Sequence, residues 1–105
     1  MLLFIDQTNF NQITFAVLDK KLVKKVYKIH PQKSSETLGK LEAFLKTAKV
    51  KLPSVTKIIV NKGPGSYTGT RVGVTHALAL GFALSVPVTP MTNEKFLISI
   101  NKLSK

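Results

Sequence analysis

The residues whose types and spacing suggest chemistry most directly form a glycine-rich segment between an apolar run and an expected helix. They are Gly63, Pro64, Gly65, Ser66, Tyr67, Thr68 and Gly69. A strand, a glycine-rich turn and a helix in succession can present backbone N–H groups to an anion, so the segment could hold a phosphate. The spacing fits neither a Walker loop nor a dinucleotide fingerprint, because no Gly-Lys-Ser/Thr follows and three residues separate Gly65 from Gly69. A structural turn is therefore favoured over a phosphate site.

Outside this segment, few side chains could carry a reaction. Asp6 follows an apolar run and, with Thr8, could contact a nucleotide or position a metal through water; the alternative is an Asx-type turn. His30 and His76 lack the spacing of metal ligands, and there are no paired carboxylates. The absence of cysteine excludes thiolate zinc sites and fits a cytoplasmic protein. The sequence predicts no catalytic residue and no metal site, with His30 in a loop and His76 packed on a helix face.

A series of small residues begins at the end of the glycine-rich segment and recurs at intervals of four. Its members, called here the small-residue ridge, are Gly69, Gly73, Ala77, Gly81 and Ser85. Glycine inside a helix costs about 0.5–1 kcal/mol relative to alanine, so the ridge needs an offsetting gain from close packing. Two interpretations remain open. In the first, the ridge packs within the chain, against its own sheet or first helix. In the second, it packs against a helix of a partner.

The charge balance is strongly basic. The chain has 16 basic and five acidic residues, a formal net charge of +11, and all but one of the cations are lysine. Such a field attracts phosphate backbones or an acidic partner, although scattered lysines also solvate a surface without a functional role. Dedicated nucleic-acid readers normally use arginine forks, and the plausible stacking aromatics are Phe10, Tyr27 and Tyr67. A solvated lysine surface is favoured, and a small basic nucleic-acid-binding module is kept as an alternative.

The elements that would position these residues begin with strands. Three apolar or partly alternating runs joined by short polar turns predict an antiparallel meander over residues 2–5, 13–18 and 22–29. A helix capped by Ser34 or Ser35 follows, with Glu36 in its first turn. Its expected apolar face contains Leu38, Leu41, Leu45 and Ala48.

The second half of the chain alternates strand and helix. The run Val55–Val60 predicts a strand parallel to one of the first three, because a helix connects them. A helix from about Thr70 to Leu84 follows, and then a short strand or extended link at Pro87-Val88. A last helix, capped by Thr92, carries Phe96, Leu97, Ile100 and Leu103. The order is βββαβα, then β or a link, then α, which indicates an α/β fold in one domain over residues 1–105.

One uncharged stretch could be either a membrane-spanning helix or a buried helix of the core. Residues 72–93 contain no charge, but their continuously apolar part ends at Pro87 and falls short of the about 20 residues that span a bilayer. The N-terminus lacks the basic region of a targeting segment. The sequence therefore predicts a buried core helix and no membrane contact.

The segment Gly63–Gly73, GPGSYTGTRVG, resembles the GPGSFTGxRxG signature of the TsaB (YeaZ-like) family, with Tyr67 in place of phenylalanine. Weaker similarities are Asp6 with Thr8, Ser35-Glu36 before the first helix, and Val86-Pro87-Val88 with Thr92. The sequence departs from the family pattern at three places. Ser34 stands where the family has histidine, Lys40 stands at a proline position, and Gln7 lies between Asp6 and Thr8.

The resemblance implies a ribonuclease H-like (actin-like ATPase) lobe, a relative of the catalytic subunit TsaD, which modifies adenosine 37 of tRNAs. Residues 1–105 correspond to the N-terminal lobe, and the second lobe of the family is absent from this sequence. In the actin-like fold a nucleotide lies between lobes. The resemblance therefore implies no cofactor for the isolated lobe, with ATP or ADP held at most at the interface of a complex.

The resemblance also implies a function in the formation of threonylcarbamoyladenosine, as a non-catalytic scaffold or activator that binds a TsaD-type subunit. A TsaE-type ATPase is a further implied partner, a homodimer is expected for the chain by itself, and tRNA contact is expected to be weak and indirect. We expect the partner interface on the helix that carries the small-residue ridge, Gly69–Ser85, and on the outer face of the first helix, with Arg71 and Lys46. The alternative from another class is a reduced actin-like phosphotransferase that binds a nucleotide through Asp6 and Thr8.

Overall fold

The computed structural model describes residues 1–9, 11–28 and 35–103, with the backbone alone at residues 35, 36, 102 and 103. His30, Ser34 and Phe10 lie outside the described residues. A single 3-10 turn, Leu52–Ser54, precedes the fourth strand. The strands and helices are β1 (Leu2–Asp6), β2 (Gln12–Leu18), β3 (Leu22–Lys28), α1 (Ser35–Ala48), β4 (Lys57–Asn61), α2 (Tyr67–Leu84), β5 (Val88–Met91) and α3 (Asn93–Leu103).

The strands form one five-stranded sheet in the order β3-β2-β1-β4-β5. β1 pairs antiparallel with β2, and β2 pairs antiparallel with β3, which confirms the predicted meander. β4 lies parallel to β1, with Phe4 opposite Ile59, and β5 lies parallel to β4. The parallel pairs follow from the helical connections, because a chain that crosses over through a helix returns in the same direction.

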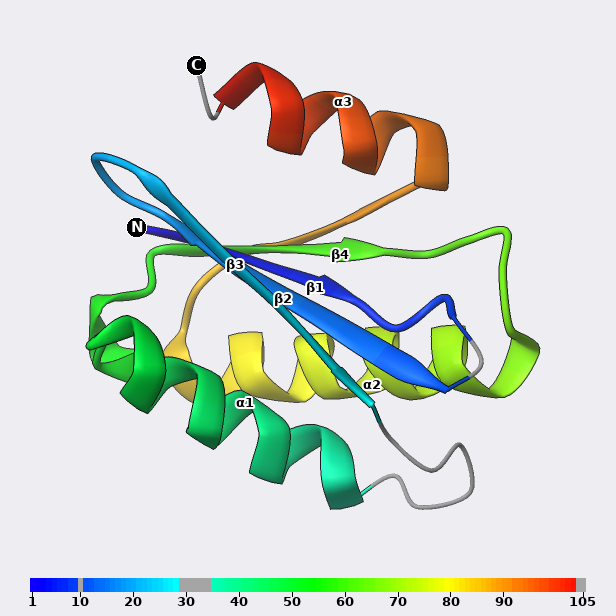
Figure 1. Cartoon of the computed structure of the whole chain (residues 1–105), viewed down its shortest axis with the longest axis horizontal. Coiled ribbons are helices and arrows are strands. Elements are labelled where there is room, and N and C mark those ends of the chain that lie inside the picture. Colours follow the sequence, from blue (N-terminus) through cyan, green and yellow to red (C-terminus); the bar gives the residue numbers. More distant parts are fainter. Residues whose placement is uncertain (10, 29–34, 104–105) are drawn as a thin grey trace.

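Helices cover the two faces of this sheet unequally. Figure 1 shows α1 and α2 on one face and α3 on the other. Successive strand residues point to opposite faces, so Leu3 and Ile5 face α1 and α2, whereas Phe4 faces α3. Phe44 of α1 stacks on Phe15 with ring centroids 5.7 Å apart, and Phe96 of α3 meets Phe4 edge-on at 5.9 Å. The two cores thus fix α1 and α3 against opposite faces of the sheet.

The starts of two elements differ from the sequence-based prediction by two residues or more, and β5 extends to Met91. β4 begins at Lys57 rather than Val55, and α2 begins at Tyr67 rather than near Thr70. The earlier start of α2 has a local cause. The Oγ of Ser66 accepts a hydrogen bond from the backbone N–H of Gly69 at 3.2 Å, which is the N-cap interaction. The last residues of the glycine-rich segment therefore belong to the first turn of α2.

The predicted buried faces were correct only in part. Leu41 and Leu45 are buried, but Leu38 is 53% exposed and Leu97 of α3 is 46% exposed. The prediction of a buried core helix for α2 was wrong, since Phe82 is 88% exposed. The cause is that α2 is apolar on several sides, so periodicity could not identify the side that faces the sheet. In the described part of the chain, no helix is long and apolar enough to cross a membrane.

Candidate partner surface and motif loop

The glycine-rich segment, Gly63–Gly69, packs closely around the end of β1. The backbone N–H of Ser66 donates to the carbonyl oxygen of Thr8 at 2.6 Å. A Cβ atom at Gly65 would lie 2.5 Å from the Cβ of Thr8, and one at Gly69 would lie 2.5 Å from the carbonyl oxygen of Gln7. Side chains cannot be added at either position without moving the backbone. The structure thus supports the structural turn that the spacing favoured.

A buried asparagine holds the other end of this segment. Asn61, fully buried at the end of β4, accepts a hydrogen bond from the N–H of Gly63 at 2.9 Å and donates to Oδ1 of Asn93 at 3.0 Å. The N–H of Asn93 donates back to the carbonyl of Gly63 at 2.8 Å. Gly63 itself has a φ of +100°, a conformation that favours glycine. Asn61 therefore ties the segment to the start of α3.

Asp6 and Thr8 lie together, as the sequence suggested. Oδ1 of Asp6 accepts hydrogen bonds from the backbone N–H of Thr8 at 2.9 Å and from its hydroxyl at 2.6 Å. This is an Asx-type turn with an added hydroxyl contact, which was the structural alternative for Asp6. In residues 1–9, 11–28 and 35–103, no three acidic, histidine or cysteine side chains are grouped to hold a metal ion.

Gln7, which interrupts the family pattern, is a buried connector. It is 3% exposed, and its Oε1 accepts a hydrogen bond from the hydroxyl of Thr37 in α1 at 2.9 Å. A Cβ atom added at Gly73 would lie 3.0 Å from the Cβ of Gln7. Gln7 therefore packs β1 against both helices of this face. Sequence analysis missed the roles of Asn61, Gln7 and Thr37. For Asn61 and Gln7 the available signal was a polar residue at the end of a buried strand, whereas nothing in the sequence indicated that Thr37 would pair with Gln7.

The partner interface expected along the small-residue ridge has to be corrected at four positions. Gly69, Gly73, Ala77 and Gly81 are all buried within the chain. A Cβ atom at Gly81 would lie 2.2 Å from Cγ2 of Val88 in β5, and Ala77 is 0% exposed in the core beneath α2. The ridge lets α2 approach its own sheet, so a partner's helix cannot contact these four residues.

The other three residues expected at a partner interface are exposed. Ser85 ends α2 in a left-handed conformation, and its N–H donates to the carbonyl oxygen of Phe82 at 3.3 Å. The Arg71 guanidinium lies 5.1 Å from the ring centroid of Tyr67 and donates to its hydroxyl. Lys46 forms an ion pair with Glu42 at 3.7 Å. Their contact with a partner stays a prediction.

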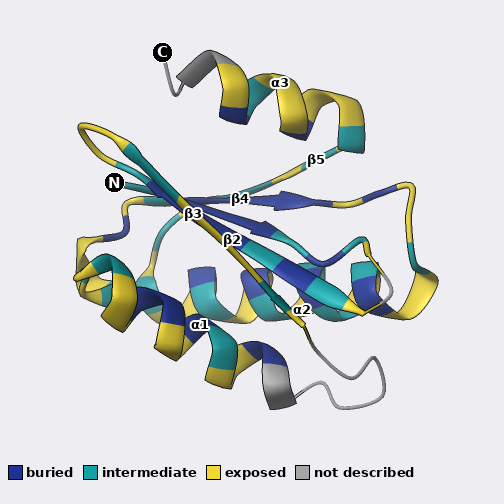
Figure 2. Cartoon of the chain, in the orientation of Figure 1, coloured by how far each residue is buried: buried dark blue, intermediate teal, exposed yellow. Residues whose placement is uncertain are grey.

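The outward sides of α1 and α2, where the sequence predicted a partner surface, carry exposed apolar side chains that the sequence analysis did not identify. Leu38 and Leu78 are 53% and 51% exposed, and Phe82 is 88% exposed. A groove of about 340 Å³ lies between the helices. It is lined by Leu38, Leu41, Glu42, Leu45, Leu52 and Leu80. Leu78 and Phe82 do not line this groove, because at about 100° per residue they lie about 160° around α2 from Leu80. We call the groove residues, together with the separate exposed pair Leu78 and Phe82, the α1–α2 apolar face, and Figure 2 shows the exposed segments along both helices.

His76 lies in the middle of α2, and a second depression lies at the N-terminal end of this helix. His76 of α2 is half-buried, and desolvation by this burial lowers its pKa below the ordinary 6.5. Its Nδ1 has no hydrogen-bond partner within the described residues. An open depression of about 300 Å³ borders the glycine-rich segment, between Lys62 and Arg71. The partial burial of His76 agrees with the predicted packing role.

Comparisons with known proteins place this geometry in a family. The model of the family described as TsaD, tRNA N6-adenosine threonylcarbamoyltransferase, matches residues 18–105. The tRNA threonylcarbamoyladenosine biosynthesis protein TsaB of Bacillus subtilis is 32% identical over 94 residues, covering 88% of this chain and 41% of the relative. The protein of the same name from Buchnera aphidicola is 27% identical over 89 residues, covering 84% of this chain and 42% of the relative.

Solved structures agree with these matches. YeaZ from Pseudomonas aeruginosa superimposes with a TM-score of 0.77 at 27% identity, over 87% of this chain and 43% of that chain. RuvC from Thermus thermophilus, at 17% identity, has a TM-score of 0.55 over 87% of this chain and 63% of that chain, and it shows the fold alone. The predicted ribonuclease H-like fold is confirmed. The chain spans about two fifths of the length of the curated relatives it matches. It belongs to the family described as TsaD and, within it, to the TsaB (YeaZ) group.

Proposed function

We propose that this protein is a non-catalytic partner subunit in tRNA threonylcarbamoyladenosine biosynthesis. In this role it binds a TsaD-type catalytic subunit and supports the modification of adenosine 37, with a TsaE-type ATPase as a further component. The names of its relatives, TsaB proteins of threonylcarbamoyladenosine biosynthesis, support the pathway. The match to the TsaD family supports a partner of similar fold, because related lobes often pack in pseudo-symmetric pairs.

The observation that carries the partner role is the α1–α2 apolar face. Soluble monomers rarely expose a large contiguous apolar surface, and such surfaces commonly mark interaction sites. Phe82 and Leu78 project from one side of α2, and the groove beside Leu38 lies between α1 and α2, so the face offers both protruding side chains and a groove. A helix pair of the catalytic subunit would fill the groove and cover Phe82. In the isolated chain, a second copy would cover the same face and form a homodimer.

The proposal assigns no catalytic residue and no bound cofactor to the isolated chain. Oδ1 of Asp6 is already engaged by the N–H and hydroxyl of Thr8, which supports a structural role for this carboxylate. ATP or ADP would be held only where this lobe meets another lobe or subunit. Calorimetric titration of the isolated chain with ATP should give a dissociation constant of about 1 mM or weaker, and micromolar binding that Asp6→Ala abolishes would favour the phosphotransferase alternative.

Reconstitution tests the function itself. The cognate TsaD-type subunit, tRNA and the enzyme supplying threonylcarbamoyl-adenylate are incubated with and without this chain, and threonylcarbamoyladenosine is measured in the tRNA. We expect product to increase when the chain is added and none to form when the TsaD-type subunit is omitted. Product formed by the chain without that subunit would contradict the non-catalytic role. Equal product with and without the chain would contradict the activator role.

A further inference from the structure

The positive charge of this protein is concentrated in one hairpin. Five lysines fall within residues 20–28, a stretch that contains no aspartate or glutamate. They are Lys20, Lys21, Lys24, Lys25 and Lys28, called here the lysine hairpin. The whole chain has 16 basic residues, so these nine positions hold five of the 16. The composition had suggested scattered lysines, and the fold places these five on a single structural unit.

The lysine hairpin occupies an exposed edge of the sheet. All five lysine side chains are exposed, and β3 is the outermost strand of the sheet. Figure 1 shows the turn of the β2–β3 hairpin at the upper left, beyond the other strands of the sheet. Lys24 and Lys28 point to the same side of β3, about 13 Å apart at ~3.3 Å per residue. Lys25 points to the other side, toward α1. The edge strand β3 therefore carries lysines on both of its faces.

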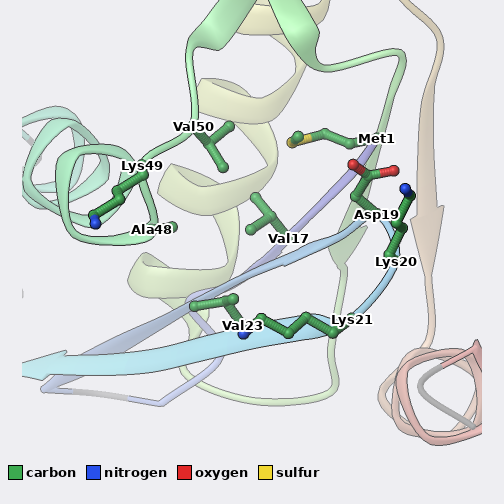
Figure 3. Close-up of a pocket in the computed structure, with 9 residues that line it drawn as sticks. All are labelled: Met1, Val17, Asp19, Lys20, Lys21, Val23, Ala48, Lys49 and Val50. Atoms are coloured by element: carbon green, nitrogen blue, oxygen red, sulfur yellow. The ribbon is translucent and has the colours of Figure 1, made fainter.

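Helix α1 extends the positive surface on one side. Lys25 and Lys40 lie 5.4 Å and 6.0 Å from the ring centroid of Tyr27, one from each element. At the turn of the hairpin, Lys20 and Lys21 border a depression of about 310 Å³ together with Lys49 from the end of α1, as Figure 3 shows. The same depression contains one acidic side chain, Asp19.

We propose that the lysine hairpin binds the phosphate backbone of tRNA. Like charges at this density repel one another, and a polyanion relieves the repulsion while releasing condensed counterions. The contact is to phosphates rather than bases, because the ring of Tyr27 packs against Phe15, with centroids 6.3 Å apart, and is partly buried. Tyr27 is therefore not a stacking residue, and the direct contact proposed here replaces the weak, indirect tRNA contact expected from the sequence. The inference rests on the proposed function, which supplies tRNA as the nucleic acid present.

A different role for edge lysines is protection against strand pairing between molecules. That role predicts self-association of the protein when the lysines are removed. Phosphate contact instead predicts that tRNA binding becomes less dependent on salt. Lys24 and Lys28 distinguish the two, because both are exposed and neither contacts Tyr27 as Lys25 does. The matched control removes the same charge elsewhere, at Lys62 and Lys95, which are also exposed.

The test measures binding of unmodified tRNA transcripts to the protein across a salt series. A plot of the logarithm of the tRNA association constant against the logarithm of the salt concentration has a negative slope. If each lysine neutralises one phosphate, Lys24→Gln/Lys28→Gln makes this slope less steep by about 1.5, at ~0.7–0.9 per phosphate. Affinity at low salt should fall on the order of tenfold, equally for all tRNAs. Lys62→Gln/Lys95→Gln should leave slope and affinity close to wild type. The turn variant Lys20→Gln/Lys21→Gln, which removes no residue of a paired strand, should repeat the effect.

Three results would overturn the proposal. They are an unchanged salt slope in both hairpin variants, an equal loss in the control variant, and self-association of the hairpin variants with unchanged tRNA binding. Light scattering and circular dichroism on each variant report association and folding. Affinity for the TsaD-type subunit is measured on the same variants. If the hairpin variants lose tRNA binding but still bind the TsaD-type subunit, the result supports the hairpin contact. If the wild-type protein does not bind the TsaD-type subunit, the result contradicts the proposed function instead.

Discussion

At the scale of single residues, buried polar side chains determine how the motif loop is held. Asn61 bridges Gly63 and Asn93, while Gln7 accepts from Thr37 beneath α2. Each is nearly or fully buried, and an unpaired polar group in such a position costs about 1–3 kcal/mol. These residues therefore position the loop as well as stabilise it.

His76 gives a prediction for the pH dependence of stability. Its pKa in the folded protein is lowered below the ordinary 6.5 by burial, so the unfolded chain binds the proton more readily. The free energy of unfolding should therefore fall as the pH decreases below about 6.5. Urea unfolding of wild type and His76→Gln at pH 7.5 and 5.5 checks this. The variant should lose less stability over this interval, and an identical loss in both proteins would contradict the assignment.

The sequence predicted some of these residues and not others. The Asx-type turn of Asp6 with Thr8 was predictable because it depends on a local preference. Gln7 and Thr37 are 30 positions apart in the sequence, so their hydrogen bond depends on how α1 packs on β1. A single sequence contains no local signal for such a contact.

At the scale of elements, helix α2 has two functions on opposite sides. Its small-residue ridge allows close approach to β1 and β5, while Leu78 and Phe82 face outward. The i, i+4 spacing predicted that one side of the helix would pack closely. It could not identify the partner, because a sheet and a foreign helix both favour small residues. The predicted meander and the parallel direction of β4, by contrast, followed from turn lengths and the helical connection.

Two glycine-to-alanine substitutions test the packing of the ridge. Gly69→Ala should destabilise the protein by about 1–3 kcal/mol, because its Cβ would meet the Gln7 carbonyl oxygen at 2.5 Å. Gly39→Ala in α1 is the matched control, since its Cβ would have no neighbour within 4 Å. It should stabilise the protein by about 0.5–1 kcal/mol through helix propensity. Equal stability of the two variants in urea unfolding would show that α2 does not approach β1 so closely.

At the scale of the whole molecule, different surfaces carry different properties. The α1–α2 apolar face covers one side, and the lysine hairpin occupies an edge of the sheet. A subunit bound to the apolar face would leave Lys24 and Lys28 free on the other side of β3. Protein and tRNA could then be held at once. The net charge could be read from the composition. That the lysine hairpin lies at an edge of the sheet became known only from the order of the strands.

The most direct test of the partner role is the affinity of this protein for its cognate TsaD-type subunit. Leu78→Ser on α2 and Leu97→Ser on α3 make the same chemical change at residues that are 51% and 46% exposed. By sedimentation or calorimetry, wild type and Leu97→Ser should bind with equal affinity. Leu78→Ser should bind about tenfold more weakly, a change of ~1.4 kcal/mol. No binding by the wild-type chain, or equal binding by both variants, would contradict a partner surface on α1 and α2.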